Sequence, residues 1–78
     1  MNIFVGNLNS LTTAHHLSDL FLRFGKVLSS KIMMDTGTGH SLGFGIITMD
    51  KRSGLVAIEQ LNNFNFMNSY MEVNEVAL

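Results

Sequence analysis

Cysteine is absent from this 78-residue sequence, so neither a disulfide framework nor a thiolate metal site can stabilise its fold. Charged residues are also scarce, at 14%, while apolar residues make up 46%; this excludes a disordered tail and suffices for one hydrophobic core. No apolar run approaches the roughly 18 residues of a membrane span, and no basic-then-apolar leader indicates a signal peptide. We therefore expect a soluble, cytoplasmic protein whose residues 1–78 form a single domain.

A basic excess is missing as well. Five Lys and Arg residues against six Asp and Glu residues give a formal net charge of −1. Nucleic-acid-binding domains usually carry a positive excess, because neutralising phosphates supplies much of their affinity. The overall charge therefore counts against a strong nucleic-acid binder, and only the placement of the five basic residues could reverse this conclusion.

What the sequence does contain is a regular series of apolar patterns separated by turn residues. Their order, β-α-β-β-α-β, predicts an α+β, ferredoxin-like sandwich: a four-stranded antiparallel sheet with two helices on one face and the other face open. We expect loops at residues 36–41 ("TGTGHS") and 64–66 ("FNF"). The expected strands are 2–8 ("NIFVGNL"), 27–35 ("VLSSKIMMD"), 42–49 ("LGFGIITM") and a last one within 68–76 ("NSYMEVNEV"), and the expected helices lie within 11–26 and 50–63.

Both expected helices have an apolar side and a recognisable start or stop. Thr13 is a suitable N-cap for the first helix and Gly25 a suitable C-terminal stop. Gly54 should weaken the first turn of the second helix by roughly 1 kcal/mol relative to alanine. The apolar sides comprise Leu17, Leu20, Phe21 and Phe24 in the first helix, and Val56, Ala57, Ile58 and Leu61 in the second.

Alternation along the strands predicts which side chains face the helices and which are left on the open face. The inward set is Ile3, Val5, Ile32, Gly45, Ile47, Met49, Met71 and Val73. The outward set is Phe4, Lys31, Met33, Phe44, Ile46, Thr48, Tyr70, Glu72 and Asn74. A contiguous apolar patch on a small domain usually marks a binding site. The glycines beside Phe44 favour this interpretation, since they would clear space for a flat ligand.

These residues resemble the RNA recognition motif family over nearly the whole chain. "IFVGNL" (3–8) is similar to the family's hexamer motif, and "LGFGIITM" (42–49) to its octamer motif. "LSDLFLRFGKV" resembles the family's first helix, "AIEQLNN" its second and "MEVNEV" its last strand. As a compact single module, the chain looks like the small stand-alone members found in bacteria.

The resemblance implies that single-stranded RNA, or single-stranded DNA as an alternative, lies across the open face. Phe4 and Phe44 match the stacking aromatics of the two motifs, and each stacked base is worth about 1–3 kcal/mol. Ile46, Met33 and Tyr70 would add apolar contacts, and Lys31 a phosphate contact. Main-chain groups of residues 74–76, near Asn74, would read base edges.

Several departures from the family pattern predict weak, sequence-tolerant binding. Leu42 occupies the octamer's basic position, so one phosphate contact is lost. Ile46 replaces a second aromatic, whereas Met49 replaces an aromatic only at an inward position. Glu72 adds a negative charge to the open face, and the loop at 36–41 lacks Lys and Arg, with His40 as its sole candidate cation.

The remaining basic residues have ordinary structural explanations at this stage. Arg23 and Lys26 are expected to end the first helix, where cations suit the helix dipole. Lys51 and Arg52 are expected to precede the second helix. Lys31 is then the only basic residue on the open face, which predicts few phosphate contacts and a shallow salt dependence.

Sites of other kinds find little support. "GTGHSLG" has the wrong spacing and context for a dinucleotide fingerprint. His15 and His16, being consecutive on a helix, diverge by about 100° and are poorly placed to share a metal ion. Asp19 and Glu59 lie on different helices and form no catalytic pair, and methionines usually just fill apolar gaps. We expect no enzymatic activity, no metal and no cofactor.

One alternative remains open for the same face, namely protein interaction or self-association. Leu42, Ile46 and Met33 make this face more apolar than a usual RNA platform, and an exposed Phe64 in the following loop could extend the patch. Sedimentation distinguishes the two hypotheses, since a monomer at high concentration argues against a homodimer.

Overall fold

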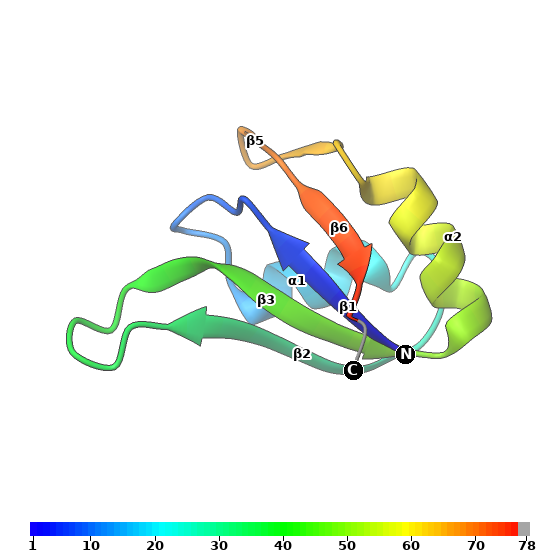
Figure 1. The fold of residues 1–78 in the computed structure, drawn as a ribbon, viewed down its shortest axis with the longest axis horizontal. Helices are drawn as coiled ribbons and strands as arrows, with labels where there is room; N and C mark the ends of the chain where they lie inside the picture. Colours follow the sequence, from blue (N-terminus) through cyan, green and yellow to red (C-terminus); the bar gives the residue numbers. More distant parts are fainter. Residues whose placement is uncertain (77–78) are drawn as a thin grey trace.

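A computed structural model describes residues 1–76 of the chain and confirms the expected sandwich (Figure 1). Four antiparallel strands form one sheet in the order β2-β3-β1-β6, and two helices lie against one of its faces. A short two-stranded hairpin is added before the last strand. The elements are β1 (Asn2–Gly6), α1 (Ala14–Phe21), β2 (Val27–Met34), β3 (Ser41–Met49), α2 (Lys51–Leu61), β4 (Asn65–Phe66), β5 (Ser69–Tyr70) and β6 (Glu72–Glu75).

The core lies between the sheet and the helices, and it contains the side chains that alternation assigned to it. Both helices contribute to the same cluster, which fixes them to one face of the sheet and leaves the other face open. Its strand members are Ile3, Val5, Ile47, Met49 and Val73, joined by Met71 just before β6, by Leu17, Leu20 and Phe21 from α1, and by Ala57 and Leu61 from α2. Ile32 is partly buried against this cluster, as expected.

Helix α2 packs closely on β1 because residue 54 has no side chain. A Cβ placed on Gly54 would collide with the Met1 side chain and come within 3.3 Å of Ile3 Cδ1. The glycine that weakens the helix locally therefore allows its tertiary packing. The prediction for the apolar side of α2 is wrong at Val56, whose side chain is 47% exposed. The buried residues of the helix are Gly54, Ala57 and Leu61, which recur at helical spacing, and Val56 lies outside this buried stripe.

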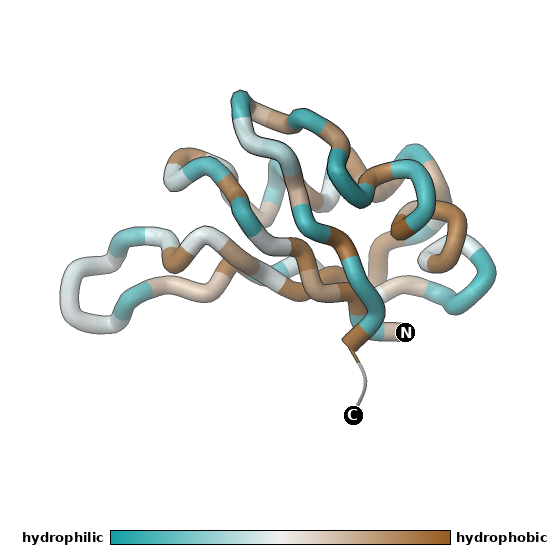
Figure 2. Tube along the Cα trace, turned by 45° about the horizontal axis from the view of Figure 1, so that its top comes forward, coloured by the Kyte–Doolittle hydropathy of each residue, from teal (hydrophilic) through white to brown (hydrophobic). Residues whose placement is uncertain are grey.

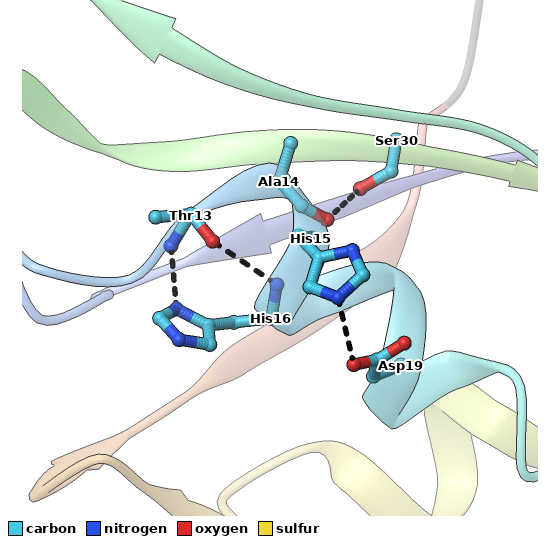
Figure 3. A network of polar contacts seen from close by, with 6 residues as sticks. All are labelled: Thr13, Ala14, His15, His16, Asp19 and Ser30. Atoms are coloured by element: carbon cyan, nitrogen blue, oxygen red, sulfur yellow. Dashed lines mark hydrogen bonds and ion pairs between the residues drawn. The ribbon is translucent and has the colours of Figure 1, made fainter.

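Helix α1 begins where the sequence predicts and ends earlier. Thr13 is its N-cap: the Thr13 hydroxyl accepts from the His16 N–H at 3.1 Å, and the Thr13 N–H donates to His16 Nδ1 at 3.0 Å (Figure 3). This reciprocal pair is a capping box with histidine in the place of the usual Glu or Gln. The helix ends at Phe21 rather than near Gly25, since the chain turns there while still packing Phe24 on the core.

The start of α2 is capped by a carboxylate. The Ser53 N–H donates to Asp50 Oδ1 at 3.1 Å. This backbone hydrogen bond is the main cause that holds the pKa of the Asp50 carboxyl below its usual value, with a smaller contribution from the Ser53 hydroxyl. Lys51 and Arg52 are the first two residues of the helix, not residues before it.

Strands β2 and β3 are the longest, and their pairing is irregular at two points. Ile32 pairs with Gly45 and Met34 with Ser41, so Met33 faces an enlarged stretch of β3 around Gly43. Gly43 has a φ of 82°, a left-handed conformation that favours glycine, and its carbonyl accepts from the Leu8 N–H at 2.9 Å. This bulge lies near the start of β3, and its hydrogen bond joins that part of the strand to the loop that follows β1.

The hairpin β4–β5 differs from the loop and single strand expected at 64–76. Its two-residue turn has a positive φ at Met67 (51°) and Asn68 (66°), the pattern of a type I′ turn. The Met67 carbonyl accepts a hydrogen bond from the Asn9 side-chain amide at 2.8 Å, and the Met67 sulfur accepts one from the Thr12 hydroxyl at 3.3 Å. These bonds join the hairpin to the β1–α1 loop.

No helix within residues 1–76 is long and apolar enough to cross a membrane. Across the same residues, no three His, Cys, Asp or Glu side chains gather as metal ligands would.

Candidate nucleic-acid interface

One row of residues crosses the open face through all four strands. Lys31 on β2 lies opposite Ile46 on β3, Ile46 opposite Phe4 on β1, and Phe4 opposite Asn74 on β6. Residues in register on one face have their side chains side by side. The row therefore runs from a cation through two apolar side chains to an amide, and we call it the central row.

Phe44 adds a second aromatic ring beside the central row. The rings of Phe4 and Phe44 are stacked, with centroids 5.8 Å apart and planes inclined by 29°. Both side chains are partly exposed and absent from the core cluster, so they form a flat apolar surface on the solvent side of the sheet. The structure thus brings together the two residues on which the sequence interpretation chiefly depended.

The glycines around these rings have roles different from those expected. A Cβ on Gly45 would collide with the Lys31 carbonyl oxygen, and Gly43 is required by its backbone conformation. Gly6 is the residue that gives space on the open face: a Cβ there would lie 2.6 Å from Cε2 and 2.7 Å from Cζ of Phe4, so the Phe4 ring lies directly over it.

Met33 and Tyr70 lie at the margins of this face. Met33 follows Lys31 by two residues on β2 and is 39% exposed. Tyr70 is 66% exposed but belongs to β5, and Met71 separates it from β6. The expected continuous last strand is therefore interrupted at this position. The Tyr70 carbonyl accepts from the Asn7 amide at 2.7 Å, which ties the hairpin to the end of β1.

A second row, not identified from the sequence, lies beside the central row and is polar. Thr48 on β3 pairs with Asn2 on β1 and with Ser29 on β2. The Thr48 hydroxyl donates to Asn2 Oδ1 at 2.7 Å. The sequence predicted only that Thr48 faces outward. Its partner Asn2 lies before the hexamer motif and was not singled out. Alternation within a strand does not show which residues of two strands are paired, so the row could not be deduced from it.

The electrostatics of the open face are close to neutral. Lys31 is exposed on β2, and Glu72, opposite Gly6, is exposed on β6. The Asn74 amide donates to a Glu72 carboxylate oxygen at 3.3 Å. Leu42, at the octamer position that is usually basic, is 52% exposed and supplies no charge. The two charged side chains therefore stand at opposite edges of the sheet.

A four-stranded antiparallel sheet that carries stacked phenylalanines on its uncovered face defines this chain as an α+β domain with an aromatic sheet platform. The chain belongs to the RNA recognition motif family, whose family model matches residues 3–72.

Known proteins of the same kind resemble it closely. The chain is 41% identical, over 92% of its length, to the glycine-rich RNA-binding protein GRP1A of Sinapis alba, of which the match covers 44%. The crystal structure of RNA-binding protein PG1 superimposes with a TM-score of 0.95 at 38% identity, covering 97% of this chain and 93% of that one. A solved Sxl-lethal protein/RNA complex superimposes with a TM-score of 0.92 at 27% identity, covering 99% of this chain and 47% of that one.

The curated relatives are longer proteins. The chain spans between 18% and 46% of the length of five curated relatives that it matches. The family and the fold therefore apply to this chain, whereas more than half of each of these relatives lies outside the match.

Proposed function

We propose that this chain binds single-stranded RNA on the open face of its sheet, with Phe4 and Phe44 stacking on unpaired bases. The observation that carries the proposal is the exposed, stacked pair of rings on adjacent central strands. An unpaired base has a π-face of matching size, and stacking on such a platform is worth about 1–3 kcal/mol per base. Membership of the RNA recognition motif family supports the same ligand.

The other side chains of the face would assist in narrower ways. Lys31, at one end of the central row, is in position to contact a phosphate. Ile46, between Lys31 and Phe4, would pack against a sugar or base, as would Met33 and Tyr70 at the margins. Asn74 and neighbouring main-chain groups would hydrogen-bond base edges, while Glu72 would repel phosphate.

This distribution favours weak binding with little sequence preference. Stacking accepts any base, since every base has a π-face. Within residues 1–76, Lys31 is the one cation on the open face itself, and phosphate contacts are the main source of non-specific affinity. The proposal needs no catalytic step and no cofactor, and it treats the 78 residues as a single module that acts in the cytoplasm.

Truncating one ring tests the proposal directly. Phe44→Ala should lower affinity for a short uridine-rich oligonucleotide at least about tenfold, since one stacked base is worth about 1–3 kcal/mol. Phe64→Ala is a matched control, because Phe64 is also an exposed phenylalanine but lies in the connection between α2 and β4. An NMR titration measures affinity and location together. Absence of binding by the unmutated protein, or equal affinity of the Phe44 and control variants, would contradict the proposal.

Two further measurements address finer points. Repeating it with the corresponding deoxyoligonucleotide determines whether single-stranded DNA is also bound. Sedimentation at high protein concentration, with and without RNA, determines whether the open face also joins two copies of the chain. A dimer that RNA dissociates would place self-association on the face of Phe44, and a monomer under both conditions would exclude it.

A further inference from the structure

Four of the five basic residues lie at one end of the molecule. Val27 at the start of β2 pairs with Met49 at the end of β3, so the chain before Val27 and the chain after Met49 meet there. The first segment carries Arg23 and Lys26, and the second carries Lys51 and Arg52. We call these four residues the basic end.

The two segments are in direct contact. A Cβ placed on Gly25 would collide with the Ser53 side chain, so the turn before β2 touches the first turn of α2. Figure 2 shows the hydrophilic stretch that begins α2 close to the N-terminus, at the same end of the sheet as in Figure 1. The four basic side chains are exposed.

The structure removes the ordinary explanations for these charges. Arg23 and Lys26 lie beyond the end of α1 at Phe21 and outside its last turn. Lys51 and Arg52 occupy the first turn of α2, where a cation opposes the helix dipole and is typically unfavourable by about 0.3–1 kcal/mol. Within residues 1–76 none of the four is ion-paired, since the single ion pair there joins His15 to Asp19.

Acidic residues do not neutralise this end. Asp50 is adjacent and caps α2 through the Ser53 N–H, but it sets only one negative charge against the four cations. Glu75, opposite Ile3, lies on β6, whereas Lys26 precedes β2 at the other edge of the sheet. A local positive excess therefore remains in a protein whose net charge is −1.

The basic end is continuous with the aromatic platform. Between them lies the uncharged row of Ser29, Thr48 and Asn2, which offers hydroxyl and amide groups and presents no carboxylate. From Ile46 in the central row to Met49 is three residues, about 10 Å at roughly 3.3 Å per residue. An RNA strand stacked on Phe4 therefore crosses only uncharged side chains in the polar row before it reaches the basic end, where Asp50 stands beside the four cations.

We propose that the basic end binds the phosphates of the RNA strand as it leaves the open face, through Lys26, Lys51 and Arg52. The inference rests on the proposed function of the aromatic platform and extends that site beyond the sheet. Exposed ammonium and guanidinium groups are the side chains that neutralise phosphate. Binding should accordingly depend on oligonucleotide length, with the basic end engaged only by a strand that extends beyond the stacked bases.

The test compares a uridine tetranucleotide with a decanucleotide on the intact chain and on a Lys26→Gln/Lys51→Gln/Arg52→Gln variant. The unmutated protein should bind the decanucleotide with a steeper dependence of log K on log salt than the tetranucleotide. The variant should lose this difference: three lost contacts flatten the slope by about 2, at roughly 0.7 per single-strand phosphate. Tetranucleotide affinity should stay within about twofold, since this ligand does not reach the basic end.

Two further variants separate the possible failures. Lys31→Gln should weaken both oligonucleotides, since Lys31 stands in the central row, and Phe44→Ala should do the same more strongly. One possible outcome is that Phe44→Ala weakens tetranucleotide binding while the triple substitution leaves decanucleotide binding unchanged. In that case the basic end does not bind phosphate, and the proposed stacking on Phe4 and Phe44 is retained. If neither oligonucleotide binds, the proposed function itself fails. Circular dichroism of the triple variant, whose three positions are exposed, verifies that it folds.

Discussion

Gly45 and Gly6 differ in what an added methyl group would meet, and this difference distinguishes a glycine needed for sheet packing from one that affects the binding surface. At Gly45 the methyl would strike the backbone carbonyl of Lys31, which cannot move without opening the β2–β3 pairing. At Gly6 it would strike only the far end of the Phe4 ring, which can rotate away. Gly6 also lacks a left-handed φ, so its backbone accepts alanine. Gly45 is therefore required for the pairing of β2 with β3, whereas Gly6 sets the position of the Phe4 ring.

Gly6→Ala should consequently weaken RNA binding without unfolding the protein. The displaced Phe4 ring loses part of one stacking contact, and we expect a roughly fivefold lower affinity, equivalent to about 1 kcal/mol. Thermal unfolding should change little for Gly6→Ala and should occur at a clearly lower temperature for Gly45→Ala. Oligonucleotide titration and circular dichroism melts of both variants measure these effects. Equal loss of stability in the two variants would show that Gly6 has a packing role instead.

At the scale of elements, the strands were predictable because their alternation is a local property. Phe4 between Ile3 and Val5, and Ile46 before Ile47, are assigned to their faces by period two alone. The end of α1 was not predictable in this way, since Phe24 keeps helical spacing with Leu17, Leu20 and Phe21 while the backbone has already turned.

Other features depend on contacts distant in sequence. The β4–β5 hairpin has strands of two residues, too short for a pattern, and its turn is Met-Asn rather than the usual Asn-Gly. The bonds from Asn9 and Thr12 to Met67 supply what the local sequence lacks. The pairing of Asn2 with Thr48 and the position of the Phe4 ring over Gly6 likewise require the strand register, so these parts of the candidate site emerged only in three dimensions.

The cap of α2 makes a prediction at this scale. Because the folded-state pKa of Asp50 is lowered, its stabilising effect is present above the unfolded value of about 3.9 and is lost as pH falls through the folded value. Asp50→Asn keeps a capping oxygen but loses the charge that suits the helix N-terminus. Its melting temperature should be below that of the unmutated protein at neutral pH, and the difference should vanish in acid.

Asp50→Ala is the control for that experiment, because it removes the capping oxygen altogether. Its melting temperature should stay below that of the unmutated protein at both pH values. A deficit of Asp50→Asn that persists unchanged in acid would mean that the charge of Asp50 does not stabilise α2. Circular dichroism melts at the two pH values suffice for the comparison.

At the scale of the whole molecule, the distribution of charge matters more than its sum. The net charge of −1 combines four cations at the basic end and Lys31 on the open face with six carboxylates. Glu72 and Glu75 lie on β6 and Asp50 lies at the basic end, while the other three carboxylates are Asp19, Asp35 and Glu59. Interactions between exposed charges are screened beyond about 10 Å at 0.1 M salt. A phosphate on the open face therefore responds to Lys31 and Glu72 and hardly at all to charges on the outer side of the helices.

Two substitutions that change the net charge equally can test this. Glu72→Gln removes a negative charge from the open face and retains an oxygen for the Asn74 amide, whereas Glu59→Gln removes one from an exposed position on α2. Glu72→Gln should raise RNA affinity about threefold at low salt, since exposed charge interactions are worth at most about 1 kcal/mol. The gain should shrink as salt increases, and Glu59→Gln should bind like the unmutated protein at all salt concentrations. If both variants gained equally, binding would follow the overall field of the protein rather than the local charges beside Phe4 and Phe44.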